Sequence, residues 1–84
     1  MEEIIKQLQE IARIADRTTD AGQAERAIRQ ARTAIQKAGD NPLLQNLSME
    51  LLTWESKLSV IFREPAGRQG MSKHCRHWLE KLKP

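Results

Sequence analysis

The chain has 84 residues, of which 30% are charged and 39% are apolar, and its formal net charge is +3. A chain of this length normally forms one hydrophobic core, so we expect a single domain over residues 1–84. No apolar run approaches the roughly 20 residues that a membrane helix needs, which argues against a membrane protein. A disulfide framework is excluded as well, because Cys75 is the only cysteine.

The composition favours helices over strands. Ala, Leu, Ile, Glu, Gln, Lys and Arg dominate, whereas tyrosine is absent and phenylalanine occurs once. The chain starts with the acidic, amphipathic segment MEEIIKQLQE, which lacks the basic start and apolar block of a secretory signal. We therefore expect an all-α protein of the cytoplasm.

The first two expected helices each carry an apolar stripe. Over residues 2–17 the stripe recurs every three or four positions, at Ile4, Leu8, Ile11 and Ala15, and Ile14 lies off it. The second helix, over 21–38, follows the cap residue Asp20, which forms an approximate capping box with Gln23. Its inner face alternates small and bulky residues, namely Ala24, Ile28, Ala31, Ile35 and Ala38. Such a face allows a neighbouring helix to approach closely.

The third expected helix has the clearest boundaries. Gly39 stands where a left-handed C-terminal cap belongs, and Asn41 followed by Pro42 is typical of a new helix start. The helix must end before Pro65, so we expect it over 42–63. Its stripe consists of Leu44, Leu47, Leu51, Trp54, Leu58 and Ile61.

The third helix also has apolar residues away from its stripe. Met49, Leu52 and Val60 are examples, and Met49 and Val60 point nearly opposite Leu51 on a helical wheel. A helix that is apolar almost all round is usually central and touches several neighbours. The alternative is an intermolecular surface formed by Met49, Leu52 and Val60.

The fourth expected helix spans 71–83, after a turn-rich stretch. Its start is less defined, since it could lie near Gly67 or at the cap residue Ser72. The apolar spacing of nearly 3.5 residues in all four segments predicts short antiparallel connections. We expect a small antiparallel bundle of four helices, with a three-helix core plus a C-terminal helix.

The positive charge is concentrated in the last third of the chain. Residues 1–62 hold eight Lys or Arg against nine Asp or Glu, whereas residues 63–84 hold six against two. The candidate anion-binding residues are Arg63, Arg68, Lys73, His74, Arg76, His77 and Lys81. They suggest a face for DNA or RNA phosphates, although the polar faces of small bundles often carry surplus Lys and Arg for solubility.

One pair in this segment resembles a known family. Arg68 precedes His74 by five intervening residues, a spacing similar to the Arg and His pair of the small helical ribonucleases of the HEPN class. The resemblance covers only these two residues. It implies that Arg68 would steady a phosphate and that His74 would act in acid-base transfer during RNA cleavage.

No other pattern indicates catalysis or a metal. On a helical wheel His74 and His77 lie on the polar side while Cys75 lies within the apolar stripe, so the three side chains do not converge on one ion. We expect no metal, no cofactor and no small-molecule substrate. Our leading hypothesis is a non-enzymatic protein-interaction module that binds a partner or a second copy through Met49, Leu52 and Val60. The alternative is nucleic-acid binding through 63–84.

Overall fold

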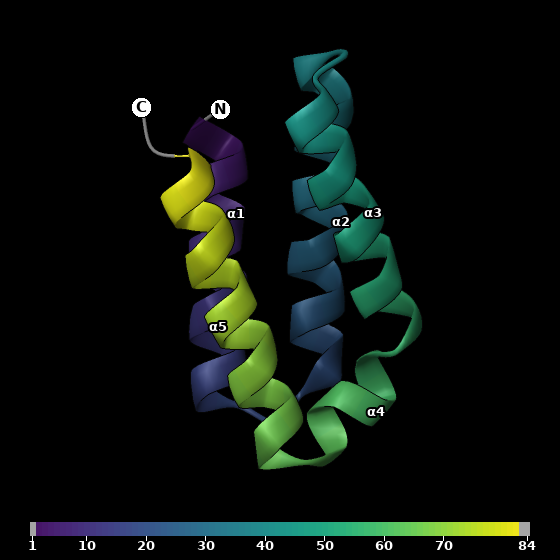
Figure 1. The fold of residues 1–84 in the computed structure, drawn as a ribbon. Coiled ribbons are helices and arrows are strands. Elements are labelled where there is room, and N and C mark those ends of the chain that lie inside the picture. The colour runs from purple at the N-terminus through teal and green to yellow at the C-terminus, as the bar shows by residue number, and fades with distance from the viewer. Residues whose placement is uncertain (1, 83–84) are drawn as a thin grey trace.

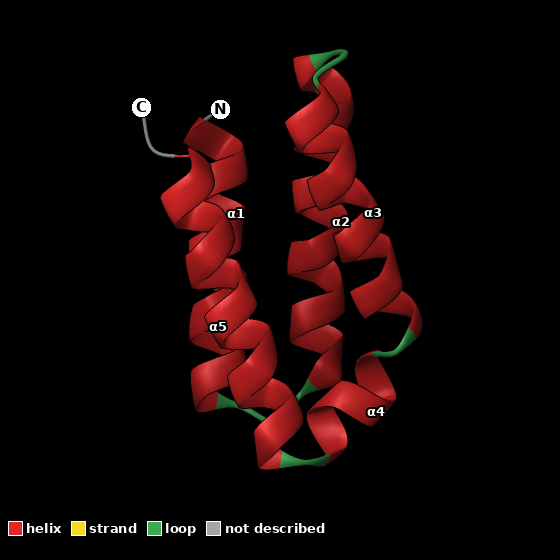
Figure 2. Cartoon of the chain, in the orientation of Figure 1, coloured by secondary structure: helices red, strands yellow, loops and turns green. Residues whose placement is uncertain are grey.

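Five helices make up most of the part of the chain that the structure, a computed structural model, describes, which is residues 2–82 (Figure 1). They are α1 (Glu2–Arg17), α2 (Ala21–Ala38), α3 (Pro42–Ser56), α4 (Leu58–Arg63) and α5 (Pro65–Leu82). Short loops join them, and no strand occurs within residues 2–82 (Figure 2). The expected all-α class is therefore confirmed. Lys83, the last residue of the expected fourth helix, lies outside the described residues.

Helices α1 and α2 form the centre of the bundle, because α1 packs against α2 and α5, while α2 packs against α1, α3 and α4. Figure 1 shows α1 beside α5 and α2 beside α3, with α4 lying across the end at which α3 stops. Two packed neighbours bury α1 on more than one side, so Ile14 is buried together with the stripe. The expectation that Ile14 lies off the buried face was therefore wrong.

The helix caps follow the rules that the sequence suggested. The Asp20 carboxylate accepts from the backbone N–H of Gly22 at 2.9 Å, and Gly39 ends α2 with φ of 86°. The Asn41 side chain accepts from the N–H groups of Leu43 and Leu44 at 3.0 and 3.3 Å. The reciprocal capping box at Asp20 was wrong, because the Gln23 amide donates to the Asp20 carboxylate, while the backbone N–H of Asp20 donates to the Thr18 hydroxyl instead of to Gln23.

The expected third helix is divided into two at Lys57. Lys57 has φ of −117° and ψ of 13°, so α3 ends at Ser56 and α4 begins at Leu58. Just before the break, the Thr53 hydroxyl donates to the Met49 carbonyl and the Ser56 hydroxyl donates to the Thr53 carbonyl, at 3.0 and 2.8 Å. Such hydroxyl contacts compete with the backbone ladder and bend helices. The single helix over 42–63 was therefore wrong.

The last helix begins six residues earlier than the expected start at 71. Glu64 is extended, with φ of −124° and ψ of 144°, as a residue before proline prefers, and Pro65 takes the first helical position. Gly67 and Gly70, which suggested a turn, are both helical. Of these two glycines, only Gly67 is required by packing, since a Cβ there would overlap the carbonyl oxygen of Ile61 in α4.

Candidate functional site

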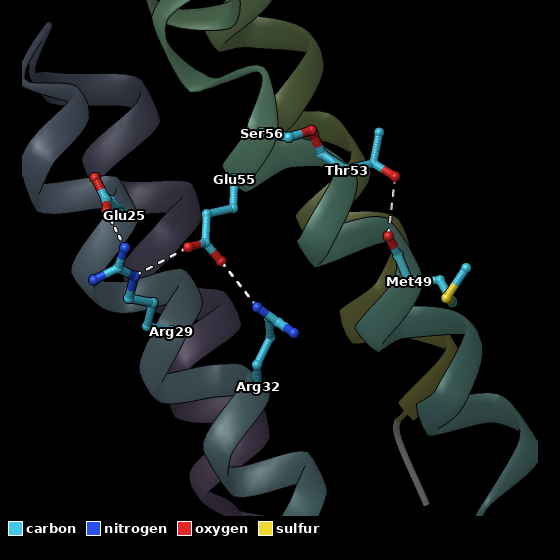
Figure 3. Close-up of polar contacts among 7 residues, drawn as sticks. All are labelled: Glu25, Arg29, Arg32, Met49, Thr53, Glu55 and Ser56. Atoms are coloured by element: carbon cyan, nitrogen blue, oxygen red, sulfur yellow. Dashed lines mark hydrogen bonds and ion pairs between the residues drawn. The ribbon is translucent and has the colours of Figure 1, made fainter.

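Both carboxylates of α3 are turned toward neighbouring helices. Glu55 accepts from Arg29 Nε and from Arg32 Nη1 of α2, each at 3.0 Å (Figure 3). These hydrogen bonds, with the Arg29 bond contributing most, lower the pKa of Glu55. Arg29 also pairs with Glu25 at 2.6 Å on its own helix. Glu55 is thus held against α2, away from the outer side of α3.

Glu50 is held on the opposite flank of α3, by α5. Its Oε2 accepts from the indole Nε1 of the buried Trp78 at 3.0 Å, and its Oε1 lies 3.7 Å from Nδ1 of His74. The His74 ring also lies against Trp54, with 6.4 Å between the ring centroids. The side chain of Glu50 therefore satisfies the indole N–H that burial would otherwise leave unpaired.

The outer side of α3 carries no charge, because its two acidic residues, Glu50 and Glu55, are hydrogen-bonded to side chains of α5 and α2. Every exposed residue of α3 is uncharged. The side chains that face away from the bundle on the helical wheel are Gln45, Asn46, Met49, Leu52, Thr53 and Ser56, which we call the neutral face. In Figure 3 Met49 and Thr53 project from the side of α3 opposite to Glu55.

The other long helices present charged outer sides. On α2 the exposed charged residues are Arg26, Arg29 and Lys37, all positive, and on α5 they are Lys73, Arg76, Glu80 and Lys81. The neutral face is therefore unusual in a chain in which 30% of residues are charged. The sequence could have indicated this face, because the 15 residues of 42–56 contain only two charged residues, Glu50 and Glu55.

The three expected interaction residues are all strongly exposed. Met49, Leu52 and Val60 keep 67%, 46% and 61% of their surface accessible. Met49 and Leu52 lie one helical turn apart on the neutral face, whereas Val60 lies on α4, beyond the break. Together with Leu43 they make up the exposed large apolar side chains of residues 2–82. The central position that α3 could have held belongs to α1 and α2.

Part of the expected basic face is used in contacts within the molecule. Arg68 donates to the backbone carbonyl of Phe62 at 2.9 Å and so caps α4. Arg76 donates to Asp16 of α1 at 2.5 Å and to Ser72 at 2.6 Å. Hydrogen bonds from Ser72 and Arg76 lower the pKa of Asp16. These two arginines therefore hold neighbouring helices together.

The remaining basic residues point outward. Lys73, His77 and Lys81 follow one another at intervals of four along the outer side of α5, and Arg63 ends α4. Lys81 Nζ lies 4.7 Å from the centroid of the Trp78 ring. The side chains of Lys73 and His77 make no hydrogen bond or ion pair with the rest of 2–82. We call Lys73, His77 and Lys81 the basic stripe.

The structure does not join Arg68 to His74. Arg68 contacts the end of α4, while His74 lies against Glu50 and Trp54, and no hydrogen bond joins the two side chains within residues 2–82. Cys75 is buried, and burial raises the pKa of its thiol to about 12. No group of three or more His, Cys, Asp or Glu side chains in the described chain is placed to hold one metal ion.

Comparison with known proteins gives no family for this chain. No family model, no curated protein and no solved structure matches it. Among the described helices, none has the length and apolar character to span a bilayer. Functional interpretation therefore depends on the two surfaces described above, the neutral face and the basic stripe.

Proposed function

We propose that the protein is a non-enzymatic helical interaction module that binds protein through the neutral face of α3. One observation carries the proposal: Met49 and Leu52 are exposed on the side of α3 that has no charged residue. The two carboxylates of α3 are hydrogen-bonded to α2 and α5 instead. The centres of protein interfaces are depleted in charge and enriched in residues such as methionine. Val60 is exposed as well, but it lies on α4, beyond the break.

The physical basis is desolvation. A charged side chain at the centre of an interface must lose its water, which costs free energy unless a partner charge replaces the water. The neutral face avoids this cost, because its polar members are amides and hydroxyls. Burial of Leu52 and Met49 would contribute roughly 1–2 kcal/mol each, since both are already partly covered. These two side chains are the expected centre of the contact.

The proposal includes the framework that presents this face. We describe α1, α2, α3 and α5 as an antiparallel four-helix bundle, because each long helix starts near the end of the molecule at which the preceding one stopped (Figure 1). In this description α4 is a cross-piece between α3 and α5. It returns the chain to the side of α1 while leaving the outer side of α3 uncovered.

Photocrosslinking tests the proposed function. A photoreactive amino acid in place of Met49, introduced in the cells that make the protein, is expected to form covalent adducts with protein. The same group in place of Thr33, on the exposed side of α2, serves as the matched control and is expected to form few. Adducts at position 49 should disappear when Leu52 is replaced by Lys.

Two outcomes would overturn the proposal. One is the absence of protein adducts at position 49 under conditions that label an established complex. The other is equal labelling at 49 and 33, which would show collisions without a preferred surface. Helix content measured by circular dichroism on each variant ensures that a negative result does not reflect unfolding, and the exposed positions make the substitutions structurally mild.

A second candidate function, nucleic-acid binding, is supported by the basic stripe. Lys73, His77 and Lys81 are aligned along one side of α5, a spacing that could follow a phosphate backbone. The expected result is salt-sensitive binding to RNA or DNA that is weakened by Lys73→Ala and Lys81→Ala. Because Arg68 already caps α4, Arg68→Ala would lower stability rather than phosphate affinity. Absence of binding at low salt would reject this candidate.

A further inference from the structure

We infer that the occupant of the neutral face is a second copy of this chain, which pairs through α3 about a two-fold axis near Met49 and Leu52. The inference rests on the proposed function and names the partner for the same surface. In a two-fold dimer each residue of the surface meets the same surface of the other copy. The surface must therefore tolerate contact with itself.

Charge selects α3 for this role. Each copy has a net charge of +3, so two copies repel each other over most orientations. Contact through the outer side of α2 would place arginines and a lysine against their own counterparts, and the outer side of α5 carries three positive residues and only one acidic residue, Glu80. The neutral face carries no charged side chain that would repel its counterpart on a second copy. The exposed residues of α3 are all uncharged. Two copies can thus meet there without opposing like charges.

The same feature argues against a strongly charged partner. Charge pairs across an interface speed association and select between partners. The neutral face offers no charged group for such pairing, since Glu50 and Glu55 are bonded to α5 and α2. A surface that complements it should be uncharged and apolar at its centre. The protein itself offers one such surface, because a second copy would present the same neutral face.

The size of the face predicts a weak dimer. A helix of 15 residues is about 22 Å long, so the contact lies at the lower end of specific interfaces. We expect a dissociation constant on the order of 0.1 mM, which corresponds to rapid exchange between monomer and dimer. Such a dimer is populated only at high concentration.

Sedimentation equilibrium of the purified protein, up to about 1 mM, tests the inference. Association should strengthen as salt is raised from low to moderate concentration, because salt screens the repulsion between two positive copies while the neutral contact is unaffected. An interface of ion pairs would show the opposite dependence. Leu52→Lys should weaken association by at least about tenfold, given the value of a buried leucine. Gln36→Lys on α2 adds the same charge outside the face and should weaken it less.

Disulfide trapping tests the two-fold geometry. Met49→Cys should form covalent dimers under mild oxidation much faster than Thr33→Cys, and Ser56→Lys should slow this trapping without removing an apolar side chain. A strict monomer at every salt concentration, or a dimer that Leu52→Lys leaves unchanged, would overturn the inference. If the purified chain is monomeric while position 49 still crosslinks to other proteins in cells, the proposed function stands and self-association is wrong.

Discussion

Gly67 of α5 lies so close to Ile61 of α4 that a Cβ at position 67 would overlap the Ile61 carbonyl oxygen. We predict that Gly67→Ala destabilises the protein by about 1–3 kcal/mol, because the two helices must separate to make room. Urea unfolding followed by circular dichroism measures the change. Since α4 and α5 meet at this point, the variant should also loosen the packing between these two helices.

Gly70, one turn further along α5, provides the matched control. A Cβ there meets nothing within 4 Å, and the residue is helical. Gly70→Ala should therefore stabilise the protein by roughly 0.5–1 kcal/mol through the smaller conformational entropy of the unfolded chain. Equal effects of the two substitutions would contradict the close contact between the helices.

The cap at the start of α3 yields a second prediction. Asn41 accepts hydrogen bonds from two backbone N–H groups, so Asn41→Ala should cost about 1 kcal/mol of unfolding free energy. The neighbouring Asp40 is exposed and has no capping bond, and Asp40→Ala should change stability by less than about 0.5 kcal/mol. Thermal unfolding of both variants distinguishes loss of the Asn41 capping bonds from a general effect of substitution in the loop. A larger loss for Asp40→Ala would count against this assignment.

The contact between Glu55 and α2 predicts a dependence on pH. The pKa of Glu55 is lowered in the folded protein, so its contribution to stability is complete above the ordinary value of 4.5 and is lost as pH falls through the lower folded value. Glu55→Gln should cost roughly 0.5–1 kcal/mol at pH 7, where Arg29 and Arg32 lose an ionised partner. The difference between variant and wild type should shrink at acidic pH.

Urea unfolding at pH 7 and below pH 4 measures this difference. The acidic series acts as an internal control, since a purely steric effect of Glu55→Gln would persist there. Asp16 adds acid sensitivity of the same sign, because hydrogen bonds from Ser72 and Arg76 lower its pKa as well. A difference that stays constant with pH would show that ionisation of Glu55 does not contribute.

Cys75 should be almost unreactive in the folded protein. Its thiol is buried and its pKa is raised to about 12, so only about one molecule in ten thousand would carry a thiolate at pH 8. Alkylation by iodoacetamide should be slow in buffer and fast in concentrated urea. A labelling rate in buffer that equals the rate in urea would contradict the burial of this residue.

The apolar spacing predicted the helices well but not the break at Lys57. Leu58 and Ile61 continue the stripe of α3 in register, so periodicity gave no sign that the chain turns there. The turn arises from tertiary packing, because α4 lies across the bundle and contacts α2 and α5. A weak local signal existed in Thr53 and Ser56, whose hydroxyls bond to backbone carbonyls just before the break.

The candidate surfaces were predictable in part. Exposure of Met49 follows from its position nearly opposite Leu51 on the helical wheel, and Leu52, which lies at the edge of the stripe, is exposed as well. The roles of Arg68 and Arg76 did not follow, because their acceptors are a carbonyl of α4 and a carboxylate of α1. Contacts between distant segments depend on how the helices pack against one another. The spacing of residues within one helix does not predict this packing.

The pairing of α1 with α5 has a consequence for synthesis. During synthesis the apolar side of α1 emerges before the other described helices, whereas α5, which covers part of it, emerges after them. Until then the apolar residues of α1 that α5 covers are exposed or sheltered by α2 alone. The core that α1 and α5 share is therefore completed only after α5 has emerged.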